Sequence, residues 1–482
     1  MKYISTRNKN LKMSFSEALL RGTAADGGLP VFEEFPDNCL NWEEVLDLSY
    51  QELAVKIGRL LTDLSESELK SCVDKAYSTG FESEDCPIAI KSMNEQVHIL
   101  ELFHGPTAAF KDMALQILPQ FIDLAVKKEQ IDKEVCIVTA TSGDTGSAAI
   151  YGFSKSANAR TVTVYPDKGI SDVQRAQMEN CGFSNSDLIK VDGCFDDAQR
   201  AVKSCLANSE FRKKVEDNGS ILTVANSMNI GRLIPQVVYY VFSYAELVRS
   251  GAVKLGDSCD VAVPSGNFGN ILAAWYAKKL GVPFRKFICA SNENQVLTDF
   301  FKTGVYDRRR DFVTTLSPSM DILVSSNLER LLFGLSNDAN LVKELQKKLV
   351  DDGFFEFDIK GSGFMSGCAN DEETVETIGS FYKETGYVLD PHTAVAIKVV
   401  EDLKEDDTPV LVASTASPFK FPETVLKALG EEDLSLERLA EVSGMKMPDE
   451  LAKVLAKGFK KVPLVPEAEL KNVLKRDVLN EK

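Results

Sequence analysis

Residues 135–153 read VCIVTATSGDTGSAAIYGF and contain a strand, a loop and a helix in that order. The first six residues are apolar or β-branched, which is typical of a buried strand. The loop from Thr141 to Gly146 is rich in Gly, Ser and Thr, and the small residues after it permit close packing of a helix. Loop amides that converge at a helix N-terminus can bind a carboxylate or a phosphate. The stretch therefore predicts a strand–loop–helix unit with an anion site at its turn.

Asp144 is the unusual member of this loop, because its negative charge opposes a bound anion. Two interpretations stay open. Asp144 either caps the helix that begins there or belongs to the binding site itself.

A second stretch, residues 260–280, has the same order of elements in DVAVPSGNFGNILAAWYAKKL. Its loop, residues 265–270, contains no cationic side chain, so a phosphate bound there would be held mainly by backbone dipoles. A single Gly-rich turn is also compatible with a tight connection of no further role. Two such turns favour one shared cleft, because loops after parallel strands lie at the carboxyl edge of the sheet.

Further short runs rich in β-branched residues alternate with helical stretches along the chain. They cover residues 161–165, 187–191, 221–225, 287–291 and 409–413. This alternation predicts an α/β fold with parallel sheets covered by helices on both faces.

The ends of the chain have a different pattern and suggest three units. The first 95 residues are predicted to be helical, with runs at Trp42–Arg59 and Glu66–Ala76. We expect an N-terminal accessory domain over 1–95, a smaller α/β domain over 96–255, and a larger one over 256–482 that ends in a helical extension.

Lys111 stands at the head of a run, residues 111–127, that is predicted to be a helix. Its polar residues form one stripe: Asp112, Gln116, Gln120, Asp123 and Lys127. Lys111 lies on the opposite, apolar face with Ala114, Leu115, Leu118, Ile122 and Ala125. Pro119 within the run predicts a kink or an early end of this helix.

Burial and a helix N-terminus both disfavour the ammonium form of Lys111, so its pKa should fall. A lysine with a lowered pKa is nucleophilic, as a Schiff base requires. The alternative is a lysine that extends from the helix end to water.

The composition excludes several classes of function. Lys and Arg total 55 and Asp and Glu total 72, so the net charge is −17. Such a charge repels nucleic acid and anionic membranes, and we expect neither as a partner. A small anionic substrate would need local cations, for which Arg330, Lys168 and Lys420 are candidates.

No metal centre is expected, because the three histidines form no H-E-x-x-H group and the ten cysteines form no C-x-x-C pair. The first 20 residues lack a secretory signal, and no apolar run approaches the ~20 residues of a membrane span. We therefore expect a cytoplasmic protein with reduced thiols.

Six motifs and an N-terminal pattern together resemble one enzyme family. The motifs are HGPTAAFKD (104–112), TATSGDTGSAA (139–149), PSGNFGN (264–270), SPSMDILVSSNLERLLF (317–333), LDPHTAVA (389–396) and STASPFKF (414–421). The N-terminal Y-x-S-T-R pattern is present at residues 3–7. The chain resembles the bacterial and fungal threonine synthases, which are fold-type-II pyridoxal-phosphate enzymes with an N-terminal extra domain.

The resemblance implies roles for particular residues. Lys111 would hold the cofactor pyridoxal 5'-phosphate as a Schiff base, and Thr415 would lie against its pyridine nitrogen. The cofactor phosphate would be held by Gly266, Asn267, Phe268, Gly269 and Asn270. The substrate carboxylate would be surrounded by Ser142, Gly143, Asp144 and Thr145. The substrate phosphate would be held by Ser326, Asn327 and Arg330, which are also compatible with a helix start and an exposed arginine.

Two positions near the C-terminal motifs bear on proton transfer. Relatives often have histidine where this chain has Ser417, which puts a proton-transfer role at that position in doubt. His392 is interpreted as structural, with a ring hydrogen bond that orients a neighbouring loop.

The activity implied is that of a carbon–oxygen lyase acting on phosphates. It would convert O-phospho-L-homoserine and water to L-threonine and phosphate by γ-elimination and β-addition of water. The alternatives are a phospholyase, a threonine or serine dehydratase, and a catalytically silent binding protein of the same fold. Relatives include monomers and dimers, so a monomer or a homodimer is expected.

Overall fold

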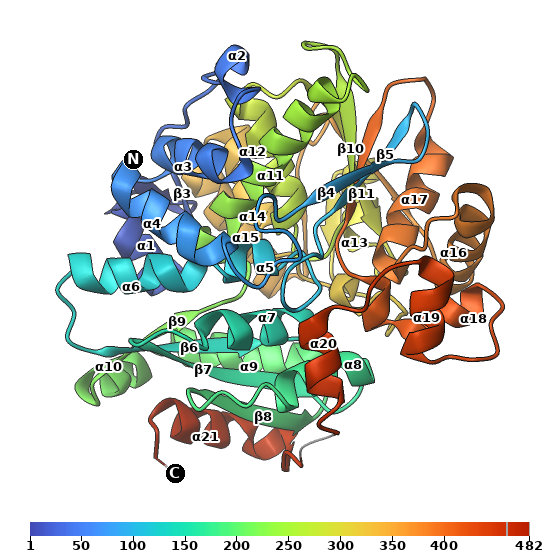
Figure 1. The fold of residues 1–482 in the computed structure, drawn as a ribbon. Coiled ribbons are helices and arrows are strands. Elements are labelled where there is room, and N and C mark those ends of the chain that lie inside the picture. The colour runs from blue at the N-terminus through green and yellow to red at the C-terminus, as the bar shows by residue number, and fades with distance from the viewer. Residues whose placement is uncertain (459–460, 482) are drawn as a thin grey trace.

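A computed structural model describes residues 1–458 and 461–481 of the chain, so residues 459, 460 and 482 of the predicted third domain lie outside the described part (Figure 1). Two large sheets and a small N-terminal sheet organise the molecule. The five-stranded sheet lies at the bottom of Figure 1, while the six-stranded sheet and the N-terminal helices lie above it. Among the described residues no helix has both the length and the apolar character of a membrane span.

The N-terminal part combines helices with a small antiparallel sheet of order β2-β1-β3. The strands are β1 (Tyr3–Ser5), β2 (Asn8–Met13) and β3 (Pro30–Phe32). The helices are α1 (Phe15–Arg21), α2 (Trp42–Val45), α3 (Tyr50–Leu61) and α4 (Glu66–Tyr77). The predicted helix over 42–59 is therefore two helices, because Ser49 caps a new one with its side chain. The sheet was not predicted.

The five-stranded sheet is parallel throughout and has the order β16-β8-β7-β6-β9. Its strands are β6 (Glu134–Ala140), β7 (Ala159–Pro166), β8 (Ser186–Asp192), β9 (Ser220–Val224) and β16 (Leu464–Pro466). Its helices are α7 (Asp144–Phe153), α8 (Asp172–Glu179), α9 (Phe195–Ala207), α10 (Ser209–Asp217), α20 (Asp449–Leu455) and α21 (Glu467–Val478).

The six-stranded sheet has the order β14-β11-β10-β15-β5-β4 and is parallel except for the edge strand β4. Its strands are β4 (Ala89–Ser92), β5 (Val97–Glu101), β10 (Cys259–Pro264), β11 (Phe284–Ser291), β14 (Phe364–Cys368) and β15 (Val410–Ser414). A separate ribbon pairs β12 (Val305–Asp307) with β13 (Phe354–Glu356).

The helices of this upper part are α11 (Ile230–Arg249), α12 (Gly269–Leu280), α13 (Val296–Thr303), α14 (Leu328–Ser336), α15 (Ala339–Asp351), α16 (Asp371–Thr385), α17 (Pro391–Leu403), α18 (Pro422–Ala428) and α19 (Leu436–Ser443). Two short 3₁₀ helices, η1 (Pro318–Met320) and η2 (Pro418–Lys420), lie in loops. Every strand predicted from the sequence is present, and the predicted α/β class with parallel sheets is confirmed.

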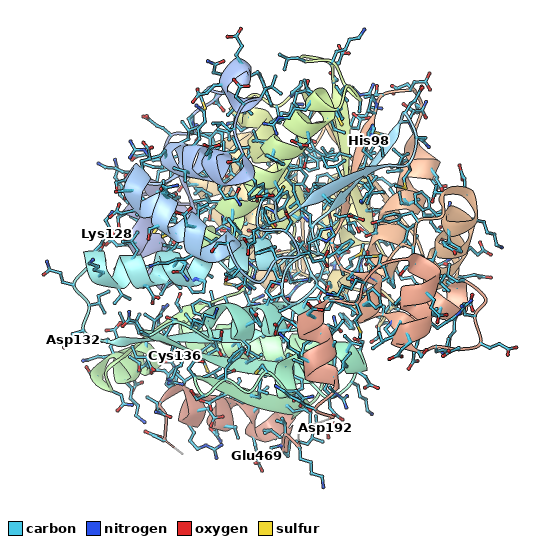
Figure 2. All side chains as sticks on the ribbon, viewed as in Figure 1. His98, Lys128, Asp132, Cys136, Asp192 and Glu469 are labelled. Atoms are coloured by element: carbon cyan, nitrogen blue, oxygen red, sulfur yellow. The ribbon has the colours of Figure 1, made fainter. Side chains whose placement is uncertain are left out.

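The sheets do not follow the predicted domain boundaries. Strand β5 falls in the predicted 96–255 unit but pairs with β15 in the six-stranded sheet. Strand β16 and helix α21, near the C-terminus, join the five-stranded sheet, whose core includes Leu470 and Leu474. The chain thus leaves the upper part between Lys128 and Asp132 and forms most of the lower part (Figure 2). It returns to the upper part through α11, and its C-terminal segment rejoins the lower part.

The predicted helix over 111–127 is also divided. It forms α5 (Asp112–Leu115) and α6 (Leu118–Lys128), and Pro119 lies in the first turn of α6, where proline is tolerated. Asp112 does not belong to a polar surface stripe. It is fully buried and accepts hydrogen bonds from the backbone and the hydroxyl of Thr107.

A close backbone contact joins the two parts of the molecule at α5 and α7. A Cβ atom at Gly152 in α7 would lie 2.1 Å from the carbonyl oxygen of Leu115 at the end of α5. Only glycine permits this approach, as the small residues in the sequence of α7 suggested. The contact sets the distance between the segments that carry Lys111 and Asp144.

Gly152→Ala should destabilise the protein by about 2 kcal/mol or more, because the added methyl group overlaps backbone that cannot rotate away. The free energy of unfolding in urea measures this loss. Gly386→Ala is the matched control, since Gly386 has a φ of +72° but open space around its Cβ. Its cost should be only that of the left-handed backbone, about 1 kcal/mol. Equal losses in the two variants would contradict the assigned contact.

Candidate active site

A cavity of about 840 Å³, counting the space open to solvent, lies where the carboxyl ends of both parallel sheets meet. Its walls include Ala140 at the end of β6, Pro264 at the end of β10 and Thr415 directly after β15. The predicted site residues that line it are Lys111, Ser142, Thr145, Gly266, Asn267, Phe268, Gly269, Asn270 and Thr415. The two Gly-rich turns and the lysine therefore face one cleft, as parallel-sheet topology predicts.

Lys111 precedes α5 and is 9% exposed. Its Nζ lies 3.0 Å from Asp144 Oδ2 and 3.3 Å from Ser319 Oγ. Burial lowers the pKa of Lys111 below its usual value, and the attraction of Asp144 only partly opposes this effect. The side chain lines the cavity, so the alternative of a lysine extended into bulk water does not describe this conformation.

The loop from Ser265 to Asn270 contains two unusual backbone features. Phe268 caps α12 with a left-handed φ of +63°, a strained conformation for a residue with a large side chain. A Cβ at Gly266 would lie 2.6 Å from the carbonyl oxygen of Ser319. Both features keep the loop amides at the start of α12 close to the cavity, where they can bind an anion.

Asn270 adds an unsatisfied donor to this loop. Its Oδ1 accepts hydrogen bonds from the hydroxyls of Tyr239 and Tyr240, which fix the orientation of the amide. Its Nδ2 is buried and has no hydrogen-bond partner in the described part of the chain. Since an unpaired buried donor is costly, the cavity is suited to a ligand with an acceptor at this point.

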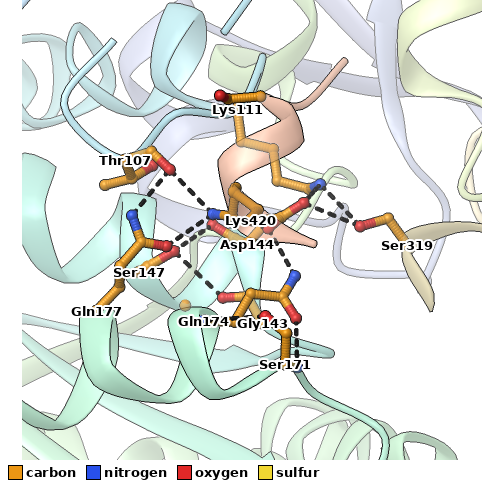
Figure 3. Close-up of polar contacts among 12 residues, drawn as sticks. Thr107, Lys111, Gly143, Asp144, Ser147, Ser171, Gln174, Gln177, Ser319 and Lys420 are labelled. Atoms are coloured by element: carbon orange, nitrogen blue, oxygen red, sulfur yellow. Dashed lines mark hydrogen bonds and ion pairs between the residues drawn. The ribbon is translucent and has the colours of Figure 1, made fainter. Parts of the chain in front are cut away.

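Asp144 is the first residue of α7, and Gly143 takes the capping position. The Asp144 carboxylate contacts two lysines, Lys111 and Lys420, and accepts a 2.8 Å hydrogen bond from Gln174 (Figure 3). Although burial opposes ionisation, the two lysines hold the pKa of Asp144 well below its usual value. Neither Gly143 nor Asp144 is among the residues that line the cavity.

Thr415 and His392 lie on the other side of the cavity. The Ser414 hydroxyl accepts a hydrogen bond from Thr393, whereas Thr415 faces the cavity, which favours Thr415 for a ligand contact. His392 Nδ1 lies 2.8 Å from Asp390, and its Nε2 accepts a 3.2 Å hydrogen bond from the Ser319 amide. His392 thus orients the loop that holds Ser319, as the sequence interpretation proposed.

Ser417, in the STASPFKF motif, has a local structural role. It is 1% exposed, and its amide donates to the carbonyl of Ala108. Its side chain caps η2 by accepting from the Phe419 amide. A proton-transfer role at this position therefore has no support.

The predicted substrate-phosphate residues lie behind the glycine-rich loop and do not line the cavity. Ser326 donates to Asn267 Oδ1, and Asn327 Nδ2 donates to the Asn267 carbonyl at 2.9 Å. Arg330 is fully buried and donates to the carbonyls of Pro30 and Met228 and to Asn327. Ser326 and Asn327 thus brace the loop from outside, and Arg330 supports Asn327.

The other predicted cations also fail to reach the cavity. Lys168 is exposed, and Lys420 is fully buried with its ammonium engaged by acceptors on three residues. A buried ammonium group without hydrogen-bond partners is costly in free energy. Lys420 therefore keeps its three acceptors and does not turn towards the cavity.

Arg232 is the cavity cation that the sequence interpretation missed. It is 3% exposed and lines the cavity, and its Nη1 donates to the carbonyl of Ala225 at 2.6 Å. Its Nε is buried without a partner among the described residues. Burial lowers the pKa of Arg232 to about 10, so the side chain stays charged at neutral pH.

A third turn of the same kind precedes Arg232, which lies in the first turn of α11. Residues 226–229 connect the predicted strand at 221–225 to α11, and Asn226 and Ser227 also line the cavity. The sequence signal was available, since polar residues follow a strand and precede a helix here as in the two Gly-rich turns. It was overlooked because this turn has no glycine before the helix.

The geometry fits pyridoxal phosphate. The cavity combines a buried amine for its aldehyde, a cradle at Gly266 that a Cβ would fill, and an unpaired donor on Asn270 for an acceptor. A phosphate at the start of α12 would satisfy that donor and the loop amides.

The two parallel sheets, the buried lysine and the glycine-rich cradle define a pyridoxal-phosphate-dependent enzyme of fold type II. The sequence matches the family described as "Pyridoxal-phosphate dependent enzyme" over residues 87–344. It also matches "Threonine synthase N terminus" over 2–77 and "Threonine synthase, C-terminal" over 393–475. The chain belongs to the threonine synthase family.

Individual relatives agree with this assignment. The threonine synthase of Pseudomonas aeruginosa is 37% identical over 95% of this chain and 97% of its own. A crystal structure of yeast threonine synthase has a TM-score of 0.86 and 34% identity, covering 100% of this chain and 99% of that one. The structure of pyridoxal-phosphate-bound threonine synthase from Brucella melitensis has a TM-score of 0.84 at 34% identity, with coverage of 100% and 99%.

The human protein named threonine synthase-like 1 is 42% identical over 87% of this chain. This chain spans only 58% of the length of that relative.

The segment that leads from β5 to Lys111 contains a charged cluster at its start. His104 lies between two carboxylates, with Nδ1 2.7 Å from Glu82 and Nε2 3.0 Å from Glu101. Burial alone would lower the pKa of His104, but the two carboxylates raise it to about 9. Tyr387 donates to the second oxygen of Glu101, which ties this cluster to the upper part of the molecule.

The stability of the protein should therefore depend on pH through His104. Since the folded pKa is raised above that of the unfolded chain, the stabilisation is fully present below pH ~6.5 and is lost as the pH rises through about 9. A shift of this size corresponds to about 3 kcal/mol. His104→Gln should remove this dependence, as measured by urea unfolding across that pH range.

His98→Gln is the control for this measurement. Burial lowers the pKa of His98, so wild-type stability through that group should fall as the pH decreases, the opposite sign. If His104→Gln and the wild type lose stability in parallel up to pH ~9.5, the role of the Glu82 and Glu101 contacts is contradicted.

Proposed function

We propose that this chain is a threonine synthase that converts O-phospho-L-homoserine and water to L-threonine and phosphate. One observation carries the proposal: the buried amine of Lys111 shares its cavity with two separate groups suited to anions. One is the loop 265–270 at the start of α12, and the other is Arg232 at the start of α11. A phosphorylated cofactor and a phosphorylated substrate together need two such groups.

The residues of the chain can be given roles in this reaction. When bound, pyridoxal phosphate supplies the aldehyde and the electron-withdrawing ring that acidify the substrate carbons. Lys111, with its lowered pKa, serves as the base that takes up and returns protons beside those carbons. Thr415 lines the cavity, and its neutral hydroxyl would lie against the pyridine nitrogen and favour the unprotonated form of that nitrogen.

The substrate is oriented by the remaining cavity residues. Ser142, in the turn before α7, and Thr145, in the first turn of α7, line the cavity and are suited to the substrate carboxylate. Arg232, with Asn226 and Ser227 of the neighbouring turn, is suited to the substrate phosphate. This arrangement replaces Ser326, Asn327 and Arg330. Ser326 and Asn327 contact Asn267 of the glycine-rich loop from behind, and Arg330 contacts Asn327.

Assembly and location follow as further parts of the proposal. A monomer or homodimer is compatible with the site, because every group named for it comes from one chain. A cytoplasmic location is supported by the cysteines, because none of the ten, all within the described residues, forms a disulfide bond.

Two alternative enzymes remain to be separated by experiment. A phospholyase would use the same substrate but release 2-oxobutyrate, and a threonine or serine dehydratase would need no phosphate site. The charged Arg232 with its unpartnered Nε favours a phosphorylated substrate over the dehydratase. A catalytically silent protein would have no physical need for the reactive lysine.

The purified protein, loaded with pyridoxal phosphate and given O-phospho-L-homoserine, should form threonine and inorganic phosphate in equal amounts. Amino-acid chromatography and a phosphate assay measure both products. Lys111→Ala should lose the yellow absorbance of the bound cofactor and all turnover, because no other amine replaces it. Release of 2-oxobutyrate as the main product would reject the synthase in favour of the phospholyase.

The role of Arg232 has its own test. Arg232→Met should raise KM for O-phosphohomoserine about 10- to 100-fold, since a hydrogen bond to a charged group contributes about 1.5–3 kcal/mol. Inhibition by inorganic phosphate should weaken in parallel. Arg200→Met, at an exposed position on α9, should change neither quantity. If cofactor affinity falls while KM is unchanged, Arg232 belongs to the cofactor phosphate instead.

A further inference from the structure

Two buried lysines share one carboxylate beside the cavity (Figure 3). Lys111 Nζ lies 3.0 Å from Asp144 Oδ2, and Lys420 Nζ lies 2.9 Å from Asp144 Oδ1. Exposure is 9% for Lys111, 2% for Asp144 and 0% for Lys420. A carboxylate can balance only one of two ammonium charges, and an unbalanced charge is costly in such a dry environment.

The hydrogen-bond partners of the two lysines differ. An ammonium group has three N–H donors, and Lys420 finds an acceptor for each: Asp144 Oδ1, the carbonyl of Thr107 at 2.9 Å, and Gln177 Oε1 at 2.8 Å. The site of Lys420 is thus built for a cation. Lys111 has two acceptors, Asp144 Oδ2 and Ser319 Oγ, and its amine borders the cavity.

The surroundings of Asp144 also favour a fixed arrangement. Gln174 Nε2 donates to Oδ1 and the Ser319 hydroxyl donates to Oδ2, so each oxygen has one lysine and one neutral donor. Lys420 reaches this carboxylate from η2, far away in the sequence from Lys111. The ion pair of Lys420 with Asp144 therefore persists when Lys111 turns away into the cavity.

We propose that Lys420 is a positioning residue that permanently neutralises Asp144, so that Lys111 is held at this carboxylate as an uncharged amine ready to react with the cofactor. The inference rests on the proposed function, for which Lys111 must hold pyridoxal phosphate. Asp144 then serves as the place to which the Lys111 amine returns when the substrate displaces it. Lys420 itself touches neither cofactor nor substrate, because it does not border the cavity.

The charged groups around Lys111 act on its pKa in opposite directions. They are Asp144, Lys420 and Arg232, and His392 faces Asp144 from α17. Burial lowers the pKa of Lys111 most strongly; Asp144 raises it, and Lys420 and Arg232 lower it. Without the charge of Lys420, the carboxylate of Asp144 would interact with Lys111 as its single lysine partner. The ammonium form of Lys111 should then be favoured.

The pH dependence of cofactor uptake by the apoprotein tests this inference without substrate. Only the free amine condenses with the aldehyde of pyridoxal phosphate, forming a C=N bond and releasing one water. The midpoint of the rate against pH, followed by the absorbance of the bound cofactor, therefore reports the protonation of Lys111. Thermal unfolding checks that each variant is folded.

Lys420→Met should move this midpoint up by about one pH unit or more and slow uptake at pH 7 about tenfold. Asp144→Asn should move the midpoint down, because Lys111 then faces only like charges. Lys427→Met is the matched control, since Lys427 pairs with Glu423 on the surface of α18 and should leave the midpoint unchanged. If Lys420 and Asp144 had only structural roles, the two substitutions would not move the midpoint in opposite directions.

The double variant Asp144→Asn/Lys420→Met keeps the test decisive if a single variant does not fold. It removes both buried charges together and should have a higher midpoint than Asp144→Asn alone, close to that of the wild type. An unchanged midpoint in folded Lys420→Met, or equal midpoints in the double variant and Asp144→Asn, would overturn the inference.

Failure of this inference is distinguishable from failure of the proposed function. Normal cofactor uptake with opposite midpoint shifts but no threonine from O-phosphohomoserine would reject the function and support the role of Lys420. Threonine production with midpoints that do not respond to Lys420 would reject only the role of Lys420.

Discussion

The carboxylate of Asp144 is the point at which separate parts of the fold meet. Asp144 begins α7 beside the five-stranded sheet, while Lys111 precedes α5 and Lys420 lies in η2 after β15 of the six-stranded sheet. Ser319, from the loop that includes η1, donates to the same carboxylate. Because these charges are buried, they persist only while all partners are present, and the relative position of the two sheets is therefore coupled to the chemistry of Lys111.

The glycine-rich loop depends on a second set of contacts that reaches the N-terminal part. Asn267 is held from behind by Ser326 and Asn327, and Arg330 of α14 donates to the carbonyl of Pro30 in β3. Arg7 forms a bidentate ion pair with Glu329, next to Arg330, in which its Nε and Nη2 donate to the two carboxylate oxygens. The Y-x-S-T-R pattern at the N-terminus thus stabilises the helix that braces the loop, which explains why this motif accompanies the catalytic motifs in the sequence.

The fold was largely predictable from the sequence, whereas the partners of the site residues were not. Strands rich in β-branched residues and Gly-rich turns are local patterns, so the parallel sheets and the shared cleft could be predicted. Strands of three residues, such as β1 and β3, have too little pattern to recognise. Asp144 was predicted beside an anion because Lys420, its counter-ion, lies 276 positions later in the chain. Arg330 was predicted at the substrate because its residue type is basic, and its burial against backbone carbonyls depends on tertiary contacts.

A chain with a net charge of −17 can still bind a doubly anionic substrate, because the relevant field is local. Surface charges are screened by salt over about 8 Å, whereas groups inside the cavity act through a medium of lower dielectric constant. Arg232 and the loop amides at the start of α12 form this inner field. Lys420 adds little to this field, because its ammonium group is paired with the carboxylate of Asp144. Anions are then bound by Arg232, whose Nε has no partner among the described residues, and by the helix N-termini.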